Sequence, residues 1–193
     1  MSEASLQATG TPAAVEGRLL RSPATVAPFV VAVVALALAT FPLDRAIVGA
    51  FAASVLVVLS AIDIERGIIP NRIVLPAAAI VLVAQIALFP GRALEWGLAA
   101  ILAALVLMIP QLLNRAWMGM GDVKLMLLLG AALGWGVGGA VLVGLLCTFP
   151  VALLVLVRDG IGARKSTIPF GPFLSLGALI VLFSPHIAGL PTS

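Results

Sequence analysis

Long runs of apolar residues, separated by short polar joints, are the dominant pattern along this chain. A helix that crosses about 30 Å of hydrocarbon needs about 20 mostly apolar residues. Seven runs reach or approach that length, and they cover residues 24–43, 46–64, 73–90, 94–113, 121–134, 137–157 and 168–189. The fifth run is short, so a tilted or partly re-entrant helix also fits it. The pattern predicts an all-α polytopic membrane protein with about seven spans, within a range of six to eight.

Proline and glycine mark the joints between these runs, for example at Pro42, Pro70 and Pro90. Residues 1–21 are rich in small and polar residues, so we expect a disordered cytoplasmic tail there. Residues 22–193 contain no segment that could form a separate soluble domain. We therefore expect them to form one integral-membrane domain.

The composition supports the membrane assignment and excludes several classes of protein. Hydrophobic residues make up 62% of the chain and charged residues 10%, against about 45–50% and about 25% in soluble domains. The net charge is only +3, and the bases lack interleaved aromatic residues, so no nucleic-acid partner is expected. Cys147 is the single cysteine, which excludes an internal disulfide and a CxxC zinc site. We expect no metal and no cofactor.

The basic residues predict the orientation of the chain in the membrane. If the N-terminus is cytoplasmic, seven spans place nine of the eleven bases on the cytoplasmic side. Only Arg45 and Arg92 then lie outside. The nine are Arg18, Arg21, Arg66, Arg72, Arg115, Lys124, Arg158, Arg164 and Lys165.

Two aspartates stand at the cytoplasmic boundary of predicted spans. Asp63 ends the second apolar run and Asp122 opens the fifth. Ionisable residues at membrane depth usually mark a functional site, although an acid at a helix end can also be wetted by headgroup water or favoured by the helix dipole. Gly119 and Gly121, just before Asp122, permit a positive φ and a close approach of a second backbone. Helix packing is the simpler explanation of these glycines.

Two carboxyl groups that meet over one water molecule can hydrolyse a peptide bond without a metal or a serine nucleophile. The ionised member takes a proton from water, while the protonated member polarises the carbonyl and later protonates the leaving nitrogen. Asp63 and Asp122 are far apart in the chain. Their proximity must therefore come from helix packing.

At these residues the chain resembles the type IV prepilin peptidases, a bacterial family of GxGD aspartyl proteases. Three segments carry the resemblance: Asp63 followed by Ile69-Pro70-Asn71, then residues 119–125 (GMGDVKL), then residues 168–174 (IPFGPFL). A GxGD motif alone recurs by chance in many proteins. Three segments in order, each at a predicted cytoplasmic helix end, are much more specific. The resemblance covers about residues 46–185.

The resemblance implies a multi-pass enzyme of the bacterial inner membrane, with Asp63 and Asp122 as its catalytic residues. Its substrates would be prepilin or pseudopilin precursors, with a short basic leader before an apolar helix, cut on the cytoplasmic side. The products would serve type IV pili, type II secretion or DNA uptake. Long members of the family carry paired CxxC motifs and also methylate the new N-terminus. Because Cys147 is the single cysteine, we expect no methyltransferase activity here.

Further residues of the three segments are predicted to shape the site. Lys124 follows Asp122 by two positions, so on a helix it points away from Asp122 and is free to extend toward the headgroups. A contact with an acidic substrate residue, or with the aspartates, is the alternative. Glu65 and Asp159 are solvated acids that could attract a basic leader. The remaining candidates are the helix-start residues Pro70, Asn71, Pro169 and Gly171.

Two other functions compete with the peptidase. In a small proton- or cation-coupled transporter, Asp63 and Asp122 would lie along an ion path, but the chain has no internal repeat and no acid in mid-span. A non-catalytic subunit of a pilus or secretion machine could also retain this fold. The presence of both aspartates argues against that, since an inactive copy is free to lose one.

Overall fold

Proline and glycine set most of the helix boundaries. The computed structural model describes residues 23–113, 119–159 and 170–184. Within these ranges, helical segments make up the whole regular structure and no strand occurs. The helices are α2 (Pro23–Thr40), α3 (Leu43–Arg66), α4 (Asn71–Leu88), α5 (Ala93–Leu113), α6 (Met120–Leu133), α7 (Val137–Asp159) and α8 (Gly171–Leu182). Short 3₁₀ turns, η3 (Pro90–Arg92) and η4 (Gly134–Gly136), precede α5 and α7.

Each of the seven predicted apolar runs corresponds to one of these helices. The main difference is at the C-terminal end, where the run was predicted to continue to residue 189 but α8 ends at Leu182. Pro185 explains the early end, because a proline disfavours helical geometry in the residue before it. The predicted tail, residues 1–21, lies outside the described residues.

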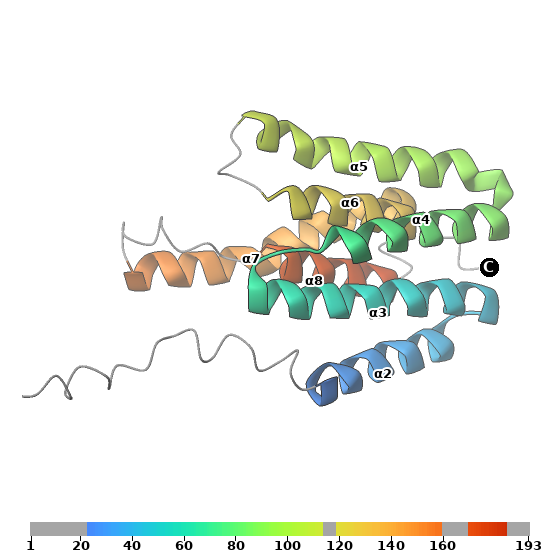
Figure 1. Ribbon diagram of the computed structural model, residues 1–193, viewed down its shortest axis with the longest axis horizontal. Coiled ribbons are helices and arrows are strands. Elements are labelled where there is room, and N and C mark those ends of the chain that lie inside the picture. The colour runs from blue at the N-terminus through green and yellow to red at the C-terminus, as the bar shows by residue number, and fades with distance from the viewer. Residues whose placement is uncertain (1–22, 114–118, 160–169, 185–193) are drawn as a thin grey trace, which may run out of the picture.

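Large apolar side chains cover the outside of the helices, as expected of a protein in lipid. Among the described residues, four stretches are long and apolar enough to cross a membrane: Leu43–Arg66, Asn71–Leu88, Pro90–Leu113 and Met120–Val155. The last stretch contains α6 and α7, which Figure 1 shows running in opposite directions on either side of η4. Helices α2 and α8 are apolar but shorter. The chain is an all-α polytopic membrane protein, as predicted, and the number of spans stays a prediction.

Helices α6 and α8 form the interior of the bundle. Helix α6 packs against α4 and α5, and α8 packs against α3 and α7, while α2 lies outside α3 (Figure 1). Most side chains of both interior helices are buried. At about 1.5 Å per residue, the 14 residues of α6 and the 12 of α8 reach only about 21 Å and 18 Å. These two helices are therefore shielded by their longer neighbours.

Successive helices reverse direction. The ends of α3, α5 and α7 and the starts of α4, α6 and α8 therefore lie on the same side of the bundle, at the left in Figure 1, where the end of α7 extends beyond the others. Among the described residues, this end carries Arg66, Arg72, Lys124 and Arg158. Arg45 and Arg92 lie near the starts of α3 and α5, at the other end. The predicted separation of bases is thus present in the bundle, and its cytoplasmic orientation stays a prediction.

Small residues let the interior helices approach their neighbours closely. A Cβ atom on Gly130 of α6 would lie 2.5 Å from the Cα atom of Ala100 and 2.6 Å from the carbonyl oxygen of Ala99, both on α5. No real Cβ atom tolerates such distances to backbone. In lipid, where apolar surface gives little drive for helix association, close backbone packing of this kind holds helices together.

Gly130→Ala should therefore destabilise the protein by about 1–3 kcal/mol, since the added methyl group forces α5 away from α6. The measurement is thermal unfolding of the purified protein in detergent. Gly97→Ala, on α5 with open space around its Cα atom, is the matched control and should be neutral or slightly stabilising. Equal behaviour of the two variants would contradict the close-packing account.

Candidate active site

Asp63 is held in the last turn of α3, where the helix ends on a left-handed glycine. Gly67 has φ +61° and its N–H donates to the carbonyl oxygen of Asp63 at 2.8 Å. Residues with a Cβ atom rarely adopt this conformation, so glycine suits the position. The side chain of Asp63 is only 6% exposed. The end of α3 thus places a carboxyl group inside the bundle.

Asp122 lies in the first turn of α6, three residues after the N-terminal residue Gly119. Its Oδ2 atom turns back toward the helix start and lies 3.7 Å from where a Cβ atom of Gly119 would be. The positive end of the helix dipole favours a carboxylate there. Neither Gly119, with φ −74°, nor Gly121 has a positive φ. The conformational reason considered for these glycines is therefore wrong. Close approach applies to Gly121 alone, where an added Cβ atom would lie 3.0 Å from the Cβ atom of Ile69.

Gly171 brings the start of α8 against Asp63. Its backbone N–H donates a hydrogen bond to the Asp63 carboxylate. A Cβ atom on Gly171 would lie 2.6 Å from Oδ2 of Asp63, so only glycine leaves the carboxyl group its present position. Pro172 occupies the first turn of α8, where its missing N–H is harmless.

Ile69 connects the surroundings of the two aspartates. It is buried. A Cβ atom added to Gly121 would lie 3.0 Å from the Ile69 side chain, and one added to Gly171 would lie 3.2 Å from it. Gly121 precedes Asp122 in the chain, and Gly171 binds Asp63. The role of Ile69 was missed in the sequence, although an apolar side chain in a short linker, where polar residues are usual, was an available signal.

The two carboxyl groups converge at this end of the bundle. Asp63 lies close enough to Asp122 for their negative charges to repel each other. Three helices supply the parts, since Asp63 comes from α3, Asp122 from α6 and the Gly171 N–H from α8. Two neighbouring carboxyl groups of this kind favour a state with one shared proton. Such a pair can act as acid and base on one water molecule.

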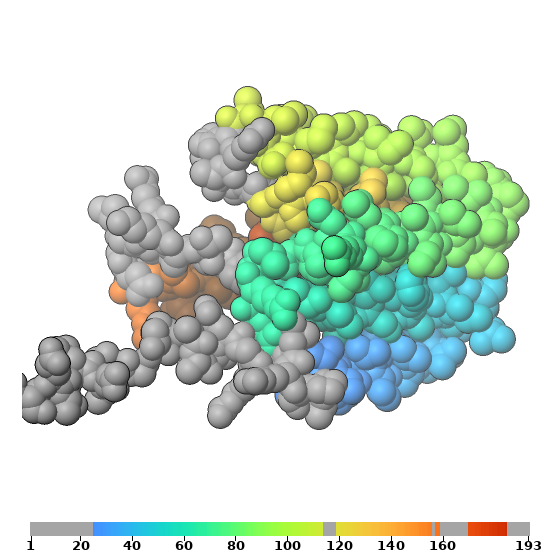
Figure 2. Space-filling model, in the orientation of Figure 1, coloured from blue at the N-terminus to red at the C-terminus, as the bar shows by residue number. Residues whose placement is uncertain are grey.

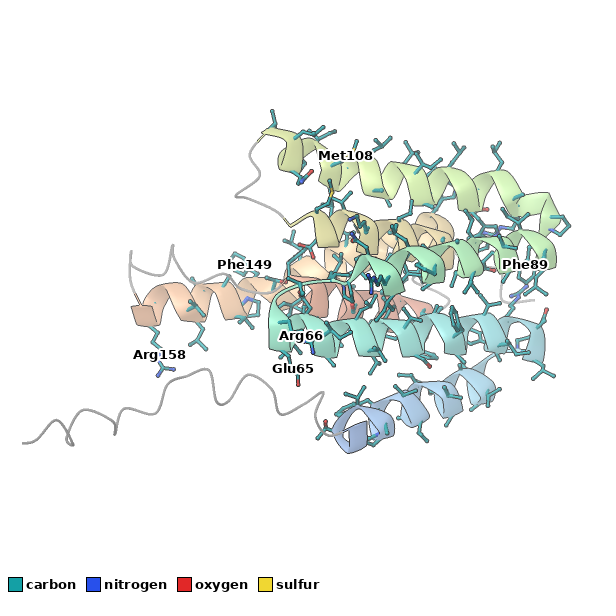
Figure 3. All side chains as sticks on the ribbon, viewed as in Figure 1. Glu65, Arg66, Phe89, Met108, Phe149 and Arg158 are labelled. Atoms are coloured by element: carbon teal, nitrogen blue, oxygen red, sulfur yellow. The ribbon has the colours of Figure 1, made fainter. Side chains whose placement is uncertain are left out.

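The other predicted site residues divide into two groups. Pro70 precedes the first residue of α4, Asn71, whose Oδ1 atom accepts a hydrogen bond of 2.7 Å from the Nζ atom of Lys124. Both residues therefore lie at the same end as the aspartates. Glu65 also lies at this end, but Figure 3 shows it extending from the side of α3 that faces away from α6. Pro169 and the side chain of Asp159 lie outside the described residues.

A sequence model of the type IV leader peptidase family matches residues 50–157. The chain belongs to this family. Two curated relatives, each named prepilin leader peptidase/N-methyltransferase and found in Burkholderia pseudomallei strains 1026b and K96243, are 31% identical over 164 residues. The match covers 76% of this chain and 50% of each relative, so the chain spans about half their length. No solved structure matches the chain.

At a pH where both aspartates are ionised, removing one of the two charges should stabilise the fold. Asp122→Asn keeps the shape of the side chain and removes its repulsion with Asp63. For a protein of this size, each kcal/mol gained should raise the unfolding midpoint by roughly 2–4 °C, measured by thermal unfolding in detergent. Asp44→Asn, an exposed acid at the other end of the bundle, should leave the midpoint unchanged. A lower midpoint for Asp122→Asn would show that the carboxylate stabilises the fold instead.

Proposed function

We propose that this protein is a membrane aspartyl endopeptidase in which Asp63 and Asp122 activate a water molecule. The observation that carries the proposal is the approach of these two carboxyl groups at one membrane boundary, close enough for their charges to interact. Membership of the type IV leader peptidase family supports it. The matched relatives are named prepilin leader peptidases, which points to the same reaction.

In the proposed reaction, one aspartate is ionised and the other carries a proton. The ionised carboxylate takes a proton from the water as the water oxygen bonds to the scissile carbonyl carbon. The protonated carboxyl group gives its proton to the carbonyl oxygen. When the tetrahedral intermediate collapses, the C–N bond breaks and the nitrogen takes up the proton that the first carboxylate removed from the water. One hydroxyl group of the intermediate returns its proton to the second carboxylate, so the dyad regains its single proton. The sum is hydrolysis, with no group left on the enzyme.

We propose prepilin or pseudopilin precursors as substrates, cut on the cytoplasmic side of the bacterial inner membrane. The site lies where apolar helices end and charged residues gather, which suits a chain that changes from a polar leader to an apolar helix. The lipid-facing apolar side chains around the bundle suit a substrate helix that stays in the bilayer. Glu65 is a candidate for attracting the basic leader by charge. Methyl transfer is not part of the proposal.

Asp63→Asn and Asp122→Asn should each lower the rate of precursor cleavage by about 10³-fold or more, since general acid–base catalysis contributes about 10²–10⁴-fold. The purified protein is incubated with candidate prepilins in detergent, and the new N-terminus is identified by mass spectrometry. Asp44→Asn serves as the control and should cleave at the normal rate. Cleavage retained by either of the first two variants would rule out the dyad. A methyl donor in the same assay should add no methyl group to the product.

Gly171→Ala tests the position of the Asp63 carboxylate without changing either aspartate. The added methyl group overlaps Oδ2 of Asp63, which is the movable end of a side chain, so the fold should survive while the carboxylate shifts. A shift of about 1 Å can cost about 10²-fold in rate, and we expect kcat to fall by that order. Gly138→Ala, with open space around its Cα atom, is the matched control. Normal cleavage by Gly171→Ala would mean that the Asp63 position is unimportant.

A further inference from the structure

The short linker between α3 and α4, together with the first residue of α4, is attached to α6 at two points. The first is the packing of Ile69 against Gly121, where an added Cβ atom would lie 3.0 Å from the Cβ atom of Ile69. The second is the hydrogen bond of 2.7 Å from Lys124 Nζ to Asn71 Oδ1. The linker begins directly after the helix that carries Asp63. Both attachments therefore relate the end of α3 to the start of α6.

The two attachments lie on either side of Asp122 in the chain and on one face of α6. Gly121 and Lys124 are three residues apart, and residues at that spacing are neighbours on a helix surface. Asp122 follows Gly121 by one position, which is about 100° around the helix at 3.6 residues per turn. The linker can therefore hold α6 by one face while the Asp122 side chain projects from an adjacent face. In Figure 2 the first turns of α6 reach the surface beside α4.

The first turn of α6 needs such an attachment. Its N-cap residue is Gly119, which has no side chain to cap the free N–H groups. Gly119 and Gly121 also lose more backbone freedom on ordering than other residues do. A helix start of this composition frays readily. Asp122 lies within this turn, so fraying would move its carboxyl group away from Asp63.

We propose that Lys124 is a positioning residue, which acts through Asn71 to hold the first turn of α6 at the distance from α3 that the dyad requires. The inference rests on the proposed function. The ammonium group of Lys124 strengthens the hydrogen bond, because bonds with a charged partner are stronger than neutral ones. Lys124 acts on the position of Asp122 and contacts neither the water nor the scissile bond. This role differs from a free extension of Lys124 to the headgroups and from a contact with substrate.

The test is a double-mutant cycle on precursor cleavage with Lys124→Met, Asn71→Leu and the double variant. Because a misplacement of about 1 Å can cost about 10²-fold, each single variant should lower kcat by about 10–100-fold and leave KM within about twofold. The double variant should be no slower than the worse single variant, since residues that act through one contact are not additive. Lys124→Arg and Asn71→Asp keep a donor and an acceptor and should retain most of the activity.

Arg72→Met is the matched control, because Arg72 is an exposed base next to Asn71 and its loss should leave kcat unchanged. Three outcomes would overturn the proposal. In the first, the fall in kcat of the double variant equals the product of the two single falls. In the second, Lys124→Met changes only KM, and in the third, it lowers kcat no more than Arg72→Met does. The second outcome would indicate a substrate contact, and the third a general effect of positive charge at the membrane surface.

The same proteins also give a readout that does not depend on cleavage. The fall in unfolding midpoint for the double variant should be smaller than the sum of the two single falls, because both remove one bond. If the wild-type protein cleaves no prepilin, the proposed function fails while this stability cycle still decides whether Lys124 and Asn71 act together. If the fall for the double variant equals that sum, Lys124 and Asn71 do not act through one bond. If the fall is smaller than the sum but kcat is unchanged in all variants, the bond exists but does not position the dyad.

Discussion

The hydrogen bond from the Gly171 backbone to the Asp63 carboxylate is the contact on which the site depends. A carboxyl group at the boundary of a lipid-embedded bundle loses much of its hydration, and this loss is costly without a partner. The start of α8 supplies that partner only because residue 171 has no Cβ atom to displace the Asp63 carboxylate. The same contact holds the Asp63 carboxylate against the start of α8. One backbone N–H therefore both solvates the carboxylate and places it.

The two aspartates oppose each other electrostatically, so packing must hold them together. Ile69 lies between the glycines on α6 and α8, and its burial stabilises the arrangement through the loss of apolar surface from water and lipid headgroups. The longer helices pack around α6 and α8, which are too short to cross a bilayer alone. The bundle thus combines lipid-facing helices that provide stability with interior helices that carry the reacting groups. Electrostatic stress at the centre of the site is consistent with catalysis, because active sites commonly retain unfavourable contacts of this kind.

Much of this fold was predictable from the sequence. The apolar runs predicted all seven described helices, since a lipid environment demands long apolar helices and the demand is local to each segment. Proline and glycine predicted the joints, as at Pro42 and Pro70, because they act on the backbone of their own and neighbouring residues. Asp63 and Asp122 were predicted as a pair from their positions at helix ends and from the motif around each. The chemistry of an aspartate pair led us to expect them near each other, but the pattern of residues along the chain does not show it.

The tertiary structure alone decided which residues hold that pair. Neither the packing of Ile69 between two glycines nor the bond from Lys124 to Asn71 could be read from the chain, although each residue lies in a recognised segment. The reason is that these helices are apolar on nearly all sides, so their sequence pattern carries little information about which face meets which neighbour. Contacts across helices depend on how far each helix is rotated and how closely glycine lets two backbones approach. Local sequence therefore determined where the helices begin and end, and packing determined how their ends meet.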